Sequence, residues 1–205
     1  MKNYGFFYKT VSPTARDCRA FVKKHLLVAI LSLIWCILGI VLGIIECGKK
    51  GAEAFVVIYG NRFYLIATRS AGIGGVFSTE FIVGILIISS ILLSTFSRYL
   101  LWVSDVLFSV ACFLKTITIG YLMIEVGVIS KILAITVLIP CFLLLIAWYC
   151  CFHAASCEFC PFGWKMGGFK RMFKCHNSHL IFFILIFIGI VVLQFLLFLF
   201  FCVLL

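Results

Sequence analysis

One long apolar stretch of the chain, residues 101–126, carries polar side chains at the spacing of a single helix face. They are Ser104, Asp105, Ser109 and Thr116, with Lys115 beside the same face. Ionisable residues are costly inside a membrane helix, so their presence there indicates a function by default. The polar face could line an ion or substrate path, bind the transmembrane helix of a partner, or pack this helix against its neighbours.

A second group of candidate ligands lies in residues 153–179, between two further apolar runs. Its thiols and imidazoles fall into two close pairs, a spacing typical of structural zinc sites. The four predicted ligands are Cys157, Cys160, Cys175 and His179. The chain has 11 cysteines, so free apolar thiols or a redox pair would explain the same pattern. A structural zinc ion is the one cofactor that the sequence allows, and no other is predicted.

The sequence does not predict an enzyme. It contains no nucleophile elbow, HExxH pattern or P-loop. Its 7 acidic residues are too scattered to suggest a pair of catalytic carboxylates, and Glu158 is the only acid near the Cys/His group. A catalytic zinc site is therefore not expected either, because no obvious general base accompanies the ligands.

The elements that position these residues follow from hydropathy. The chain of 205 residues is 65% hydrophobic and 12% charged, with a mean hydropathy of +1.26, and about 20 apolar residues cross a bilayer core. This composition predicts an all-α fold, a polytopic transmembrane helical bundle. The predicted spans, about five, are 25–45, 81–97, 101–126, 131–152 and 180–203. Residues 25–205 then form a single membrane domain after a basic segment, residues 1–24.

The net charge of +10 indicates orientation in the membrane, because Lys and Arg concentrate in cytoplasmic loops. Basic residues collect in residues 1–24 and in the 153–179 loop, whereas the 46–79 loop is mixed. We therefore expect a multi-pass protein of the cell membrane with its N-terminus in the cytoplasm against the lipid headgroups. The C-terminus is then extracytoplasmic, and no nucleic acid is a partner. In the outer loop, the apolar residues 54–68 predict a re-entrant or interfacial segment.

Two glycines predict close helix packing, and one proline predicts a bend. Gly39 and Gly43 form a GxxxG pair, which lets a second helix approach closely. That helix belongs either to this chain or to another copy, so an oligomer is one alternative. Pro140 removes a backbone hydrogen bond from the 131–152 span and favours a kink there.

Several short motifs resemble the stage II sporulation protein M family, a family of five-span bacterial membrane proteins. They are Phe113-Leu114-Lys115, Gly120-Tyr121-Leu122, Gly127, Lys131 and the apolar run through Pro140. The Lys-rich lead at residues 21–24, before the Gly39/Gly43 helix, is also similar to the opening of that family. The resemblance implies a protein without enzymatic activity that scaffolds peptidoglycan hydrolases during engulfment in spore formers. The Cys/His stretch is not a feature of that family.

Two functions of different classes are predicted. The first is a non-enzymatic scaffold that anchors membrane or cell-wall-associated proteins, such as cell-wall hydrolases during sporulation. It would use the polar face, the Gly39/Gly43 face and the outer loop. The alternative is a small transporter, or a membrane subunit of a transport system, in which Asp105 and Lys115 line a path. Substitution of either residue would impair partner assembly in the first case and solute flux in the second.

Overall fold

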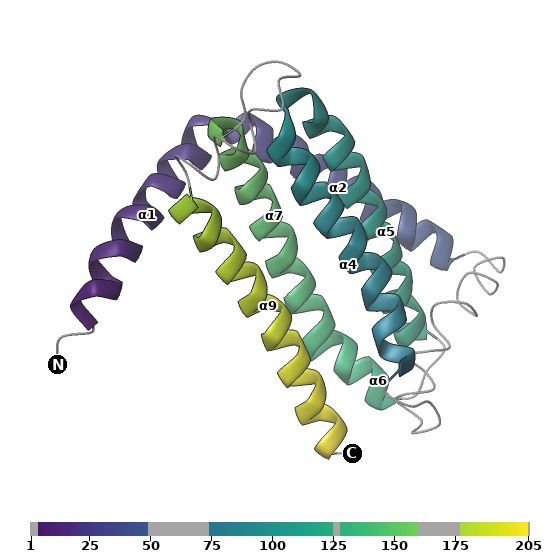
Figure 1. Cartoon of the computed structure of the whole chain (residues 1–205). Coiled ribbons are helices and arrows are strands. Elements are labelled where there is room, and N and C mark those ends of the chain that lie inside the picture. The colour runs from purple at the N-terminus through teal and green to yellow at the C-terminus, as the bar shows by residue number, and fades with distance from the viewer. Residues whose placement is uncertain (1–3, 49–73, 125–127, 160–176, 205) are drawn as a thin grey trace.

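The computed structural model describes residues 4–48, 74–124, 128–159 and 177–204, and the elements in these ranges are helices (Figure 1). They are α1 (Tyr4–Lys24), α2 (Leu26–Cys47), α4 (Gly74–Phe96), the short 3-10 helix η1 (Arg98–Leu100), α5 (Leu101–Ile124), α6 (Val128–Leu133), the π-helical turn Ala134–Leu138, α7 (Ile139–Phe159) and α9 (Asn177–Leu204). The predicted all-α class is confirmed.

The described residues include four helical stretches that are long and apolar enough to cross a membrane. These are Leu26–Cys47, Leu101–Gly120, Ala134–Glu158 and Ser178–Leu197. The remaining predicted span, residues 81–97, lies mainly in α4, whose apolar part Val83–Phe96 is shorter. In Figure 1, successive long helices from α2 onward run in alternating directions, with α6 and α7 as one pass. The chain is a multi-pass helical membrane protein.

The helices extend beyond several of the predicted boundaries. The N-terminal segment is helical from Tyr4, and α4 begins at Gly74, inside the predicted outer loop. The prediction that a loop begins at His153 is wrong, because α7 continues to Phe159. The polar side chains of this last part of α7 suggested contact with water, but they face other helices. Residues 54–68 lie outside the described part of the chain.

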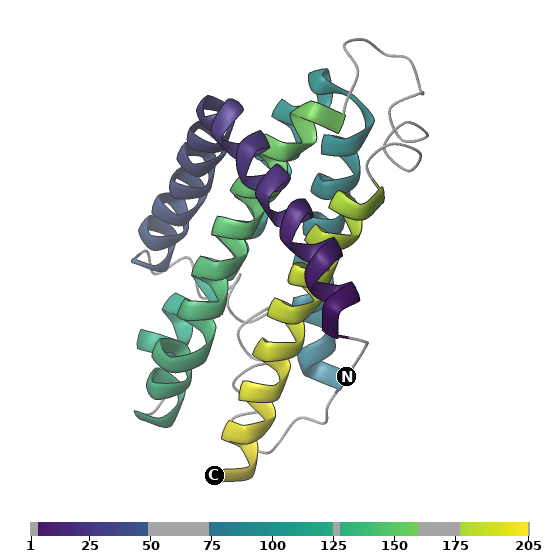
Figure 2. The ribbon, with the colours of Figure 1, turned by 90° about the vertical axis from the view of Figure 1, so that its left-hand side faces the viewer.

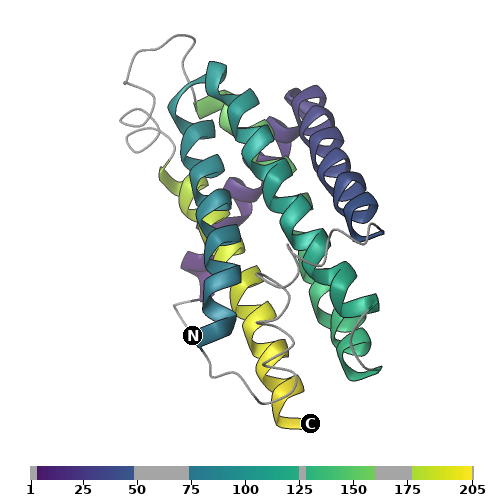
Figure 3. The ribbon, with the colours of Figure 1, turned by 90° about the vertical axis from the view of Figure 1, so that its right-hand side faces the viewer.

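α5 is the central helix of the bundle. It packs along α2 on one side and along α4 on the other, as Figure 3 shows, and α7 contacts both of these flanking helices. α9 packs against α7, and α1 crosses the outside of α7 and α9 (Figure 2). Phe108 of α5 stacks on Tyr149 of α7 with ring centroids 3.6 Å apart. The Trp148 Nε1–H group of α7 donates a hydrogen bond to the Phe183 carbonyl of α9 over 2.9 Å.

α2 approaches α5 through small residues. Its buried residues are Ser32, Cys36, Gly39 and Gly43. Their steps of four, three and four place them on one helix face. A Cβ atom at Gly39 would meet the backbone carbonyl of Ser109, and one at Gly43 would lie 2.8 Å from the Thr116 Cβ atom. The glycine pair therefore packs against a helix of the same chain.

Pro140 is the second residue after the π-helical turn. In a regular α-helix a proline lacks the N–H donor, and its ring clashes with the carbonyl four residues earlier. Hydrogen bonds in a π-helix join residues five apart, which widens the turn. The turn Ala134–Leu138 accommodates the ring in this way, so the helix continues from α6 into α7.

Candidate functional site

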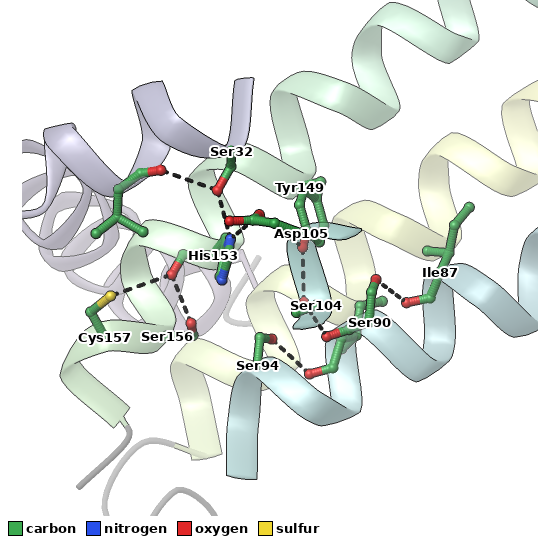
Figure 4. Close-up of polar contacts among 12 residues, drawn as sticks. Ser32, Ile87, Ser90, Ser94, Ser104, Asp105, Tyr149, His153, Ser156 and Cys157 are labelled. Carbon is green, nitrogen blue, oxygen red and sulfur yellow. Dashed lines mark hydrogen bonds and ion pairs between the residues drawn. The ribbon is translucent and has the colours of Figure 1, made fainter. Parts of the chain in front are cut away.

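Two buried ionisable side chains lie where α2, α5 and α7 meet (Figure 4). The side chains of Asp105 of α5 and His153 of α7 contact each other, with 2.8 Å between the Asp105 Oδ1 and His153 Nδ1 atoms. Their side chains are 7% and 0% exposed. Ser32 of α2 completes the contact, because its Oγ atom lies 2.6 Å from the same His153 Nδ1 atom. A buried charge of this kind is costly unless it is paired and hydrogen-bonded.

The hydrogen bonds identify the ring nitrogen that carries a proton. The Ser32 hydroxyl donates to the Val28 carbonyl over 3.1 Å, so its oxygen is an acceptor toward His153. The Asp105 carboxylate is an acceptor as well. Both acceptors face Nδ1, so we assign the proton to this nitrogen, from which it is shared between the two oxygens. Nε2 is buried and makes no hydrogen bond within the described part of the chain.

This arrangement differs from a catalytic Ser–His–Asp triad. In a triad, serine and aspartate contact opposite nitrogens of the imidazole, so the ring can take the serine proton. Here Ser32 and Asp105 both contact Nδ1 of His153. The imidazole therefore has no free basic atom directed at Ser32, and the three residues cannot activate this serine as a nucleophile.

Further hydroxyl groups extend the site from Asp105 to α4. The Tyr149 hydroxyl lies 3.4 Å from the Asp105 Oδ1 atom and 2.8 Å from the Ser104 Oγ atom. The Ser104 hydroxyl donates to the Ser90 carbonyl of α4 over 2.6 Å. The polar contacts therefore run through four helices, from Ser32 of α2 to Ser90 of α4, and Figure 4 shows them as one group.

The remaining residues of the predicted polar face point to other neighbours. The Ser109 hydroxyl donates to the Trp35 carbonyl of α2 over 2.9 Å, and the Thr116 hydroxyl donates to the Cys112 carbonyl of its own helix over 2.8 Å. Lys115 is buried, with 5% of its surface exposed. It is ten residues from Asp105, about 15 Å along the helix, so Asp105 and Lys115 are not one site.

The predicted zinc ligands are only partly described. Cys157 is buried, and its thiol contacts the His153 carbonyl of its own helix over 3.8 Å. The imidazole of His179 lies 3.6 Å from the Asp17 carboxylate. Cys160 and Cys175 lie outside the described residues. Within the described ranges, no group of three or more His, Cys, Asp or Glu residues is arranged to hold a metal ion. The structural zinc site stays a prediction.

A smaller ionic cluster joins α1 and the start of α2 to the end of α7. The Glu158 Oε1 atom lies 2.6 Å from the Lys24 ammonium group and 2.7 Å from the His25 Nε2 atom. Beside it, the Phe21 ring packs on His179 of α9, with ring centroids 5.4 Å apart. Burial, reinforced by the neighbouring Asp17 carboxylate, raises the pKa of the Cys18 thiol to about 11. These contacts fix α1 to the bundle.

Sequence reasoning missed most partners of Asp105. Ser32 and Tyr149 were not singled out, and His153 was placed in a loop with the zinc candidates. One signal was present, because Ser32 shares its helix face with the glycine pair of α2. Polar and small residues at that spacing in an apolar run indicate a face that meets protein and not lipid.

No protein-family model, no curated protein and no solved structure matches the chain. The fold and the site therefore define a class: a multi-pass helical membrane protein with a buried Asp–His pair at the meeting point of three helices. The resemblance to the stage II sporulation protein M family stays a prediction from its motifs.

Proposed function

We propose that the chain is a small proton-coupled membrane transporter, or the membrane subunit of a transport system, in which Asp105 and His153 hold the coupling proton. The buried contact between these two ionisable side chains supports the proposal. Carboxylate and imidazole groups inside membrane bundles are characteristic of proton relays in pumps and transporters. Histidine suits this role because its ordinary pKa lies near neutrality.

In this proposal the coupling proton binds to and leaves from Nε2 of His153, which makes no hydrogen bond within the described part of the chain. With neutral imidazole, the pair carries one negative charge, located on Asp105. A proton on Nε2 converts His153 to imidazolium and brings the net charge of the pair to zero. Because the site is buried, this change in net charge strongly alters the free energy of any helix arrangement that excludes water from Asp105 and His153. Protonation is thereby coupled to helix position.

The helix that carries His153 also contains an irregular turn that supports movement. The π-helical segment Ala134–Leu138 and Pro140 precede His153 on the same continuous helix. Helices bend at π-turns and prolines, and π-turns occur frequently at functional sites. Rotation or bending at this turn would move His153 relative to Asp105 on α5.

The test uses the purified full chain in liposomes. An imposed pH gradient drives uptake of a panel of labelled amino acids, sugars and cations, while an internal pH dye reports proton flux. Asp105→Asn and His153→Gln should each lower proton-coupled uptake at least tenfold. The matched control is Thr118→Val, because this buried α5 hydroxyl bonds only to the Leu114 carbonyl of its own helix. Gel filtration and circular dichroism verify folding of each variant.

Unchanged uptake in the two variants, with wild-type folding, would refute the proposal. The Asp105–His153 contact would then serve only to pack α5 against α7. In that case, a double-mutant cycle on the free energy of unfolding measures how much the Asp105–His153 contact stabilises the fold. The scaffold hypothesis is supported less well. The Gly39/Gly43 face that it requires packs on α5, and Asp105 contacts His153 of α7. These two surfaces are thus occupied within the chain. The proposal assigns no catalytic role to any described residue.

A further inference from the structure

Helix α1 lies across the outer surface of the bundle. Figure 2 shows it crossing α7 and α9 rather than continuing their direction, and contacts with both helices agree. Its inner face contains Cys18, which is 4% exposed, and Phe21, whose ring packs on His179. The Lys24–Glu158 pair fixes its C-terminal end to α7. The opposite face of α1 therefore points away from the bundle.

That outer face carries a row of basic side chains. Arg16, Arg19 and Lys23 are exposed and follow one another at steps of three and four residues, so they share one face. None of the three forms an ion pair with another described residue. The one acid in α1, Asp17, lies to the side and faces His179. Within the described ranges, no acidic side chain pairs with this positive surface.

The C-terminal end of the row, at Lys23, adjoins the first residues expected to contact lipid tails. Immediately after α1, the side chains of Leu26 and Leu27 are 55% and 70% exposed, as expected for the first residues in contact with lipid tails. The α4–α5 junction lies at the same end of the bundle in Figure 1. There Tyr99 and Trp102 are 57% and 60% exposed, and such aromatic residues are enriched at the membrane–water boundary.

We propose that Arg16, Arg19 and Lys23 form a binding surface for the headgroups of anionic phospholipids. A basic surface at headgroup depth attracts negative lipids over zwitterionic ones. α1 differs from a free amphipathic helix, because its apolar face is used on α7 and α9. The surface is therefore held in place before lipid arrives, and it faces the lipids that surround the bundle.

The experiment compares lipid retention by the full chain in mild detergent. The purified protein is mixed with equimolar phosphatidylglycerol and phosphatidylcholine, and bound lipids are counted by native mass spectrometry. The wild type should retain phosphatidylglycerol preferentially, and each neutralised position should reduce this preference about fivefold, as about 1 kcal/mol per basic residue implies. The preference should also fall with added salt.

Two triple variants separate charge from folding. Arg16→Gln/Arg19→Gln/Lys23→Gln should lose the preference, whereas Arg16→Lys/Arg19→Lys/Lys23→Arg should keep it. Equal retention of the two lipids by the wild type, or an undiminished preference in the glutamine variant, overturns the proposal. Recovery of an acidic soluble protein on this face, without any lipid preference, also overturns it.

Discussion

Gly39→Ala should lower the free energy of unfolding by about 2 kcal/mol. The added methyl group would meet the Ser109 main-chain carbonyl and lie 2.9 Å from the Ser109 Oγ atom, below the 3.4 Å at which ordinary contact begins. Overpacking costs about 1–3 kcal/mol, and a rigid main-chain neighbour places this substitution near the upper value. The gain in helix propensity from glycine to alanine, about 1 kcal/mol, offsets part of the loss.

The chain provides matched controls for this prediction. At Gly84 of α4 and Gly189 of α9, a Cβ atom would have no described neighbour within 4 Å beyond the adjacent backbone of its own helix, so their alanine variants gain helix propensity without a clash. Unfolding is followed by circular dichroism in one detergent at fixed concentration. Gly39→Ala should unfold at a lower midpoint than wild type, and the two controls at the same or a higher midpoint. If Gly39→Ala behaves like Gly189→Ala, the close approach of α2 to α5 is refuted.

Three further predictions concern α1, α9 and metal content. Glu158→Gln weakens the attachment of α1 to α7, so the buried Cys18 thiol should be alkylated faster, as measured by peptide mapping with mass spectrometry. An unchanged alkylation rate would contradict the role of Glu158 in attaching α1 to the bundle. Trp148→Phe removes the hydrogen bond to the α9 carbonyl and should cost about 1 kcal/mol of unfolding free energy, while equal stability would mean that this bond contributes nothing. If the 153–179 stretch holds structural zinc, the purified chain should contain close to one zinc per molecule, and a small fraction of that would exclude the site.

The sequence predicted the helices well because each depends on the composition of its own segment. A run of about 20 apolar residues is sufficient to indicate a membrane helix. The helix boundaries were predicted less accurately. The polar residues from His153 onward suggested a loop, whereas α7 continues to Phe159. Inside a bundle, a polar side chain needs a partner helix and not water, and hydropathy does not distinguish these two cases.

The candidate site was predicted only in part for the same reason. Asp105 was identified because it is an acid in an apolar run, which is a local property. Its contacts with His153, Ser32 and Tyr149 join segments far apart in the chain. Which polar group meets which depends on how the helices pack, and a single sequence does not contain that information.

The uneven distribution of polar side chains sets an order for biosynthesis. α2 and α9 expose apolar side chains along most of their lengths, so each can enter the bilayer unaided. α5 brings Asp105 and Lys115 into an apolar span, and a charged side chain costs up to about 2.5–3.5 kcal/mol at the centre of a membrane helix on insertion scales. The imidazole that pairs with Asp105 is synthesised later, on α7. Between these two events the growing chain is most dependent on an insertase and most open to degradation.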